Sequence, residues 1–229
     1  MELLQSADFW IGLVKIIWIN IILSGDNAVV IALAARSLPP VQQRKAIFWG
    51  TAAAVILRIA LTVVAAKLLE LPYLQIIGGL LLLWIGVQLL SDADDGKGEE
   101  KHHGSLFSAI RTILIADLIM SLDNVIGVAA AANGNIPLLI IGLAIAIPIV
   151  IFGSTLMIKL MERFPIIVTI GAGLIGWVAG EAIVSDSVLK DSFPAHSVLF
   201  YLAAAIGAVF VIAVGKFLQR RNSAGSSTS

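Results

Sequence analysis

The sequence predicts an all-α membrane protein with seven transmembrane helices, arranged as two inverted three-helix repeats plus a C-terminal helix. Composition predicts the class, because 59% of the 229 residues are hydrophobic and only 13% are charged. The mean hydropathy of +1.00 is far above that of soluble domains. A duplicated acidic motif predicts the repeats. The lipid bilayer is therefore the first expected partner.

Apolar runs of about 20 residues recur along the chain, and each is long enough to cross roughly 30 Å of hydrocarbon. Turn-forming or charged segments separate them. The runs predict helices over residues 9–35, 45–67, 73–91, 106–132, 136–160, 165–184 and 197–217. The expected organisation is a first repeat (1–91), a cytoplasmic loop rich in acids and histidine (92–105), a second repeat (106–184), an outer loop with the seventh helix (185–217) and a disordered cytoplasmic tail (218–229).

Lysine and arginine gather on one side of this map, while only Lys67 and Lys190 flank the other. The positive-inside rule then predicts a multi-pass protein of the cell membrane with its N-terminus outside and its C-terminus in the cytoplasm. The chain has no cysteine and a formal net charge of zero. These values exclude thiolate metal sites and argue against a nucleic-acid partner. No nucleotide-binding motif is present, so we expect neither ATP-driven pumping nor another enzymatic activity.

Two segments resemble each other, namely "NIILSGDNAVVIALAA" (20–35) and "DLIMSLDNVIGVAAAA" (117–132). Ser24, Asp26 and Asn27 of the first match Ser121, Asp123 and Asn124 of the second, and Asn20 stands opposite Asp117. Each motif lies in the first helix of a three-helix unit. Because three is an odd number, the second unit enters the bilayer from the opposite face, and the two motifs should meet near the midplane.

Charged residues in the middle of membrane helices are expensive, at about 2.5 to 3.5 kcal/mol for each aspartate on insertion scales. Asp26, Asp117 and Asp123 therefore predict a polar site. Asn20, Ser24 and Asn27 share one helix face, as do Asp117, Ser121 and Asn124. The alternative is that the carboxylates are protonated and only join neighbouring helices through hydrogen bonds.

Carboxylates, amides and hydroxyls are hard oxygen ligands, which suit Mn²⁺, Mg²⁺ or Ca²⁺. All three histidines fall in predicted loops, so soft metals lack intramembrane ligands. The expected metal ligands are Asp26, Asn27, Asp117, Asp123 and Asn124. We expect the ion as transported cargo and no prosthetic group.

Other polar residues are assigned to the substrate pathway or a proton relay: Asn20, Ser24, Arg58, Ser121 and Glu181. Arg58 lies in the middle of the second span, where an ion pair with a buried carboxylate is favoured over a snorkelling arginine. Glu181 fits either an exit gate or a simple rim position. Asp117 breaks the symmetry with Asn20. As a third clustered acid, it is the expected proton carrier.

The paired "SGDN" and "SLDN" motifs and the seven-span layout resemble the TerC family of integral membrane proteins, particularly its short bacterial branch of metal transporters, over residues of about 9–217. The resemblance implies export of Mn²⁺ and a distant kinship to exporters of the lysine-exporter type. It places the family's acidic motif on Asp26 and Asn27 and on Asp123 and Asn124.

The sequence thus predicts a secondary transporter that exports a divalent metal, Mn²⁺ above others, by alternating access at a midplane acidic site, with protons as a possible coupling ion. One rival is an exporter of an amino acid or small organic cation on the same scaffold. Another is a membrane scaffold that aids insertion or metal loading of other proteins. The sequence leaves open whether the protein forms a homo-oligomer.

Overall fold

A computed structural model describes residues 7–68, 71–92, 105–132, 135–190, 192–194 and 197–226, apart from the side chains of residues 7–9, 19–24, 63–68, 123, 126–127, 129–131 and 223–226. Within these ranges the chain is helical and has no strand. The helices are α1 (Ala7–Ala35), α2 (Pro40–Leu68), α3 (Leu74–Ser91), α4 (Leu106–Ala132), α5 (Ile136–Arg163), α6 (Ile166–Ser185) and α7 (Val198–Ser226).

Among the residues that the structure describes, five segments are long and apolar enough to cross a membrane: Pro40–Thr62, Leu74–Ser91, Ile136–Arg163, Ile166–Ser185 and Val198–Asn222. Large apolar side chains such as Ile56, Phe152 and Ile170 point outward and are more than half exposed. Such outward faces belong in lipid rather than in water. The chain is therefore an integral membrane protein of the all-α class.

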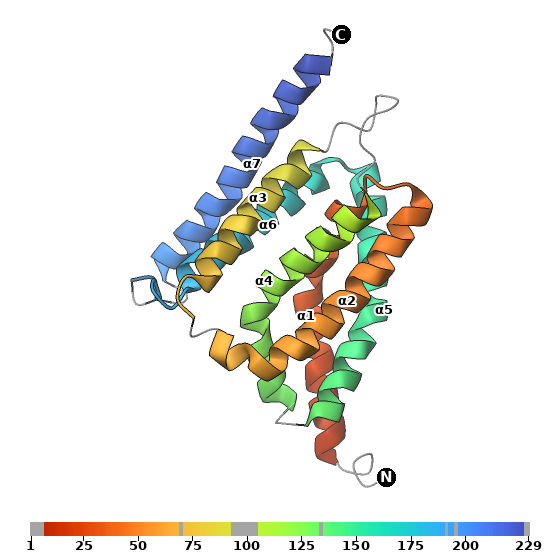
Figure 1. Cartoon of the computed structure of the whole chain (residues 1–229), viewed down its shortest axis with the longest axis vertical. Helices are drawn as coiled ribbons and strands as arrows, with labels where there is room; N and C mark the ends of the chain where they lie inside the picture. The colour runs from red at the N-terminus through yellow and green to blue at the C-terminus, as the bar shows by residue number, and fades with distance from the viewer. Residues whose placement is uncertain are drawn as a thin grey trace.

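The helices form two groups that lie side by side, with α1, α2, α4 and α5 in one and α3, α6 and α7 in the other (Figure 1). Successive helices alternate in direction, so α1 and α4 are antiparallel (Figure 1). In the first group α1 packs most extensively on α5, and α2 on α4. In the second group α6 packs on both α3 and α7.

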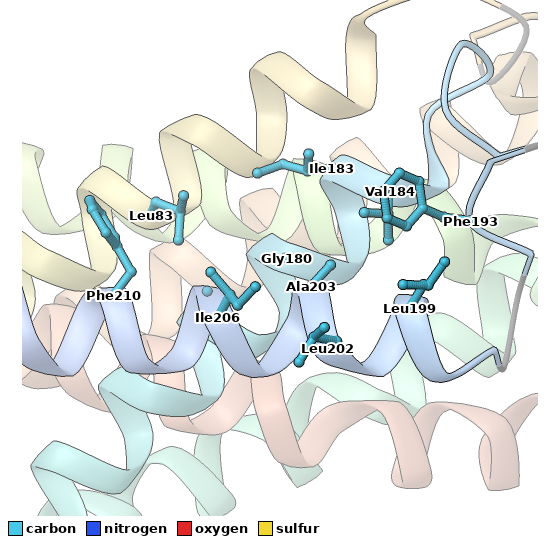
Figure 2. A pocket seen from close by; sticks show the side chains of 11 residues that line it. Leu83, Gly180, Ile183, Val184, Phe193, Leu199, Leu202, Ala203, Ile206 and Phe210 are labelled. Atoms are coloured by element: carbon cyan, nitrogen blue, oxygen red, sulfur yellow. The ribbon is translucent and has the colours of Figure 1, made fainter.

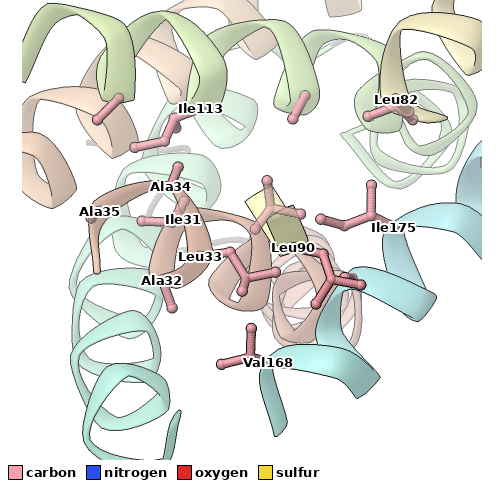
Figure 3. Close-up of a cluster of buried hydrophobic side chains, with 14 of the residues drawn as sticks. Ile31, Ala32, Leu33, Ala34, Ala35, Leu82, Leu90, Ile113, Val168 and Ile175 are labelled. Carbon is pink, nitrogen blue, oxygen red and sulfur yellow. The ribbon is translucent and has the colours of Figure 1, made fainter. Parts of the chain in front are cut away.

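The main hydrophobic core joins the two groups around the C-terminal half of α1 (Figure 3). Leu33 of α1, Leu82 of α3 and Ile175 of α6 are almost completely buried there. Ile113 of α4 closes the cluster from the other side. This core fixes α1 against α4 over the stretch that follows the first acidic motif.

Two helix boundaries differ from the sequence prediction. The predicted disordered tail from residue 218 is wrong as far as Ser226, because α7 continues to that residue; Leu218, Gln219 and Arg220 favour helix and extend the preceding span. Residues 227–229 lie outside the described residues. At the other boundary α2 begins at Pro40 instead of residue 45, since proline fits the first turn of a helix. Most of the predicted loop 92–105 also lies outside the described ranges.

Candidate polar site between α1, α2 and α4

The centre of the candidate site is a buried ion pair between two helices. Arg58 projects from α2 and Asp117 from α4, and the guanidinium NH2 group donates to Oδ1 of the carboxylate. Both residues are less than one tenth exposed. The prediction that Arg58 pairs with an intramembrane carboxylate is therefore confirmed, and Asp117 is that carboxylate.

Ser121 completes a three-residue network. Its Oγ accepts a hydrogen bond of 2.9 Å from Nε of Arg58 and donates one of 3.2 Å to Oδ2 of Asp117. Ser121 follows Asp117 by one helical turn, so the two share one face of α4, as the sequence pattern predicted. In the structure that face is turned toward Arg58 of α2. The network neutralises two charges and satisfies several of their hydrogen-bonding atoms, which is the condition for keeping such a pair away from water.

Asp26 of α1 lies beside this network. It interacts electrostatically with both Arg58 and Asp117. Its Oδ1 accepts a 2.7 Å hydrogen bond from the backbone N–H of Asn27. Asp26 is half-buried, whereas Asn27 is buried. The first acidic motif, on α1, therefore lies near the ion pair that joins α2 to α4.

A small cavity separates α1 from α4 at this point. Asn27 and Asp117 contribute the polar part of its lining, and the rest is apolar: Val30, Ile31, Ile113 and Met120. The cavity has a volume of about 10 Å³, which is roughly enough for one water molecule. An amide and a carboxylate from two different helices thus face one small space.

The structure describes only some of the other site residues that the sequence predicted. The side chains of Asn20, Ser24 and Asp123 lie outside the described residues. Asn124 is partly buried in α4. Among the side chains that the structure describes, no three acids or histidines are close enough to hold a metal ion together. The full ligand set expected from the sequence therefore stays a prediction.

Glu181 lies apart from these residues, on α6. Its Oε1 accepts a 2.8 Å hydrogen bond from Nε1 of Trp177 one turn earlier. Trp177 in turn packs against Tyr201 of α7, with ring centroids 6.4 Å apart. Glu181 therefore belongs to the α6–α7 side of the molecule, and its assignment to a proton relay stays a prediction.

Comparison with known proteins shows the family of the chain. The model of the integral membrane protein TerC family matches residues 5–223, which is nearly the whole chain. The chain belongs to the TerC family. The family resemblance inferred from the two acidic motifs is therefore confirmed.

Relatives of this TerC protein are themselves described only as membrane proteins. The chain is 44% identical to the uncharacterized membrane protein YjbE of Bacillus subtilis, over 94% of this chain and 99% of that one. It is 27% identical to the inner membrane protein YoaE of Escherichia coli, over 97% of this chain but only 45% of that longer one. It is 24% identical to YgdQ of Escherichia coli over 96% of each. No solved structure matches the chain.

The TerC chain also holds buried polar residues that the sequence analysis missed, among them Asp186 and Thr51. Asp186 follows α6 and accepts backbone hydrogen bonds from Tyr73, Gln75, Ile76 and Val188 at 3.0–3.3 Å. Burial alone would raise the pKa of Asp186, but these four N–H donors together hold it below its ordinary value. Within the described residues, the Thr51 hydroxyl of α2 is buried without a hydrogen-bond partner. A lone acid after an apolar span was the only signal for Asp186.

Proposed function

We propose that this TerC protein is a secondary transporter that exports a hard divalent cation, Mn²⁺ above others, by alternating access at the α1–α2–α4 junction. The observation that carries the proposal is the small cavity that Asn27 of α1 shares with Asp117 of α4. Asp117 is paired with the buried Arg58, and Asp26, next to Asn27, interacts electrostatically with both members of that pair. Buried acids of this kind mark ion pathways in membrane proteins. The protein would move its cargo without covalent chemistry, and so it would not be an enzyme.

Seven transmembrane spans in two inverted repeats are the architecture that we propose for it. In the proposed repeats, α1 corresponds to α4, α2 to α5 and α3 to α6. The α1–α5 contact then corresponds to the α4–α2 contact, and the two are similarly extensive. The exchanged helices run in opposite directions (Figure 1). Both features support a pseudo-twofold axis in the membrane plane, as in many secondary transporters.

The proposed orientation has the N-terminus outside and the C-terminus in the cytoplasm. Arg36 follows α1, Arg111 lies near the start of α4, and Arg163 ends α5. These helix ends are grouped at one end of the molecule (Figure 1). The positive-inside rule assigns that end to the cytoplasm.

The charges at the junction suit a divalent cargo. Arg58 offsets the charge of Asp117, which leaves Asp26 and the motif partner Asp123 to balance two positive charges. Asp117 is already bound to Arg58 and Ser121, so we assign the exchanged protons to other acids. We propose instead that Asp26 and Asp123 bind Mn²⁺ on the outward leg and protons on the return leg.

Proton exchange addresses the energetic problem of export. Moving two positive charges out of a cell against an inside-negative potential costs roughly 4.6 kcal/mol per 100 mV. Exchange for two protons makes the cycle electroneutral and removes that cost. Asn27, Asn124 and Ser121 would supply the neutral oxygen ligands that manganese and magnesium accept.

Arg58 favours a second candidate, namely export of an amino acid. A buried guanidinium can bind a carboxylate, and Asp26 nearby could bind an ammonium group. In this structure, however, Arg58 already binds Asp117 and Ser121. An amino-acid carboxylate would have to replace them, and we therefore rank this candidate second.

Purified protein in liposomes tests the proposal. Mn²⁺ trapped on one side should cross the membrane when a pH gradient drives proton exchange, and Mg²⁺ or an amino acid should compete according to its affinity. Empty liposomes are the control. If amino acids but not metals exchange, the second candidate is correct. If nothing crosses and no metal raises the unfolding temperature, a scaffold role replaces transport.

A further inference from the structure

A second concave feature lies far from the polar junction, in the group of α3, α6 and α7. It is a groove of about 370 Å³ whose lining residues are all apolar or glycine. Side chains of α7 form one wall, Leu83 of α3 contributes to the other, and Gly180, Ile183 and Val184 of α6 lie at the floor (Figure 2).

The groove is closed at one end and open at the other. Leu83 and Phe210 lie together at the closed end, while Phe193 and Leu199 lie at the opposite end (Figure 2). Beyond Leu83, α3 and α7 converge. A Cβ atom placed on Gly86 would lie 3.0 Å from Val211, and one on Gly215 would lie 2.8 Å from Leu90. The two helices therefore leave space only toward the end of the molecule where α6 ends and α7 begins.

The length of the groove corresponds to one leaflet of a bilayer. Its α7 wall runs from Leu199 to Phe210, which is about 16 Å along a helix. The hydrocarbon core is roughly 30 Å thick, so one leaflet contributes about half of that. Both α6 and α7 are segments that can cross a membrane, so the groove runs along the direction of the lipid chains.

The space suits a single flexible chain and not a helix. A helix with its side chains is about 10 Å wide, and 16 Å of such a helix fills about 1,200 Å³. The groove, at about 370 Å³, is too small to enclose a helix of that length. The rim residues Leu202 and Ile206 are more than half exposed, and so a chain can enter sideways from the bilayer.

From this geometry we propose that the groove between α3 and α7 binds one acyl chain of a membrane phospholipid, with the headgroup at the rim near Phe193. Lys190 is exposed on the turn that leads from α6 to this rim, where it can contact a lipid phosphate. The bound chain fills the groove over the α6 floor and connects α3 with α7 where they do not touch.

Native mass spectrometry of the purified protein in a delipidating detergent, after exposure to phosphatidylglycerol, tests this site. Wild type should retain one phospholipid. Ala203→Phe, which fills the groove, should lose it. Ala213→Phe is the matched control, because Ala213 is exposed on the same helix outside the groove, and it should retain the lipid.

Two further measurements keep the result decisive. If Ala203→Phe does not fold, as judged by its elution and helical signal, Ile206→Trp replaces it as the groove-filling variant. A phospholipid with a photoreactive acyl chain should label peptides that contain Ile183 and Leu202. Equal lipid retention in groove-filling and control variants would overturn the site. Displacement of the phospholipid by palmitic acid alone would also overturn it. So would disulfide cross-links between two copies of an Ile206→Cys variant.

Discussion

The α2–α4 and α6–α7 interfaces are both buried contacts between membrane helices, but polar side chains stabilise the first and close backbone packing at glycines stabilises the second. Arg58, Asp117 and Ser121 join α2 to α4 through charges and hydrogen bonds. Gly176 and Gly207 let the backbones of α6 and α7 touch, since a Cβ on Gly207 would collide with the carbonyl oxygen of Gly176. Polar side chains can exchange partners, whereas backbone contact through glycine leaves little freedom. The comparison places the proposed binding chemistry in one interface and rigid support in the other.

Loss of Arg58 should have the largest effect on stability. Arg58→Ala leaves Asp117 buried without its cation, which should destabilise the protein by about 3 to 5 kcal/mol. Replacement of both residues, as in Arg58→Leu with Asp117→Leu, should recover much of that loss because no charge remains unpaired. Unfolding in mixed detergent micelles is measured for Arg58→Ala, for the single variants Arg58→Leu and Asp117→Leu, and for the double variant. Simple addition of the two single losses would show that the pair is not coupled.

Substitution at the α6–α7 contact should have a smaller effect. Gly207→Ala forces the backbones of α6 and α7 apart, which should destabilise by about 1 to 3 kcal/mol. Gly153→Ala is the matched control, because the added Cβ would lie 3.5 Å from Ala28, an ordinary contact. Thermal unfolding of both variants checks this. Equal stability of the two would mean that α6 and α7 can separate freely.

Asp186 should have the smallest effect, and one that depends on pH. Asp186→Asn weakens the bonds to the start of α3 and should lower stability by about 1 kcal/mol at neutral pH. The folded pKa of Asp186 lies below its ordinary value of 3.8. Its stabilising contribution is therefore complete above pH 3.8 and is lost as the pH falls through the lower, folded value.

Unfolding temperatures of wild type and Asp186→Asn across this pH range check the prediction. The difference between them should shrink below pH 3.8. A difference that stays constant into strong acid would show that the carboxylate charge does not contribute.

Much of the fold follows from apolar run length, because a helix is the simplest structure that satisfies its own backbone in lipid. The need to neutralise Arg58 was also predictable from its position in mid-span. Its partner was not, because the register of α2 on α4 depends on contacts such as that of Gly50 with Ile113.

The role of Asp186 could not be predicted for a related reason. Its donors begin at Tyr73, 113 positions away in the chain, and Tyr73 adopts a left-handed conformation with φ of 65° at the start of α3. The first N–H groups of a helix need acceptors. The sequence does not show which distant side chain supplies them.

The same comparison explains why Asp117 stands opposite Asn20. Asp117 faces a cation on α2, and a neutral amide would leave that cation buried and unpaired. The difference between Asp117 and Asn20 in the two aligned segments is therefore explained by charge balance between α2 and α4. The sequence alone suggested a third free acid in its place.

One pair of matched substitutions tests the central claim, that the α1–α2–α4 junction carries the transported ion. Asp26→Asn and Asp186→Asn each remove one carboxylate, the first beside the junction and the second at the start of α3. Mn²⁺ flux into liposomes is measured for equal amounts of folded protein. Asp26→Asn should abolish flux, whereas Asp186→Asn should retain it. Wild-type flux in Asp26→Asn, or equal loss in both variants, would contradict it.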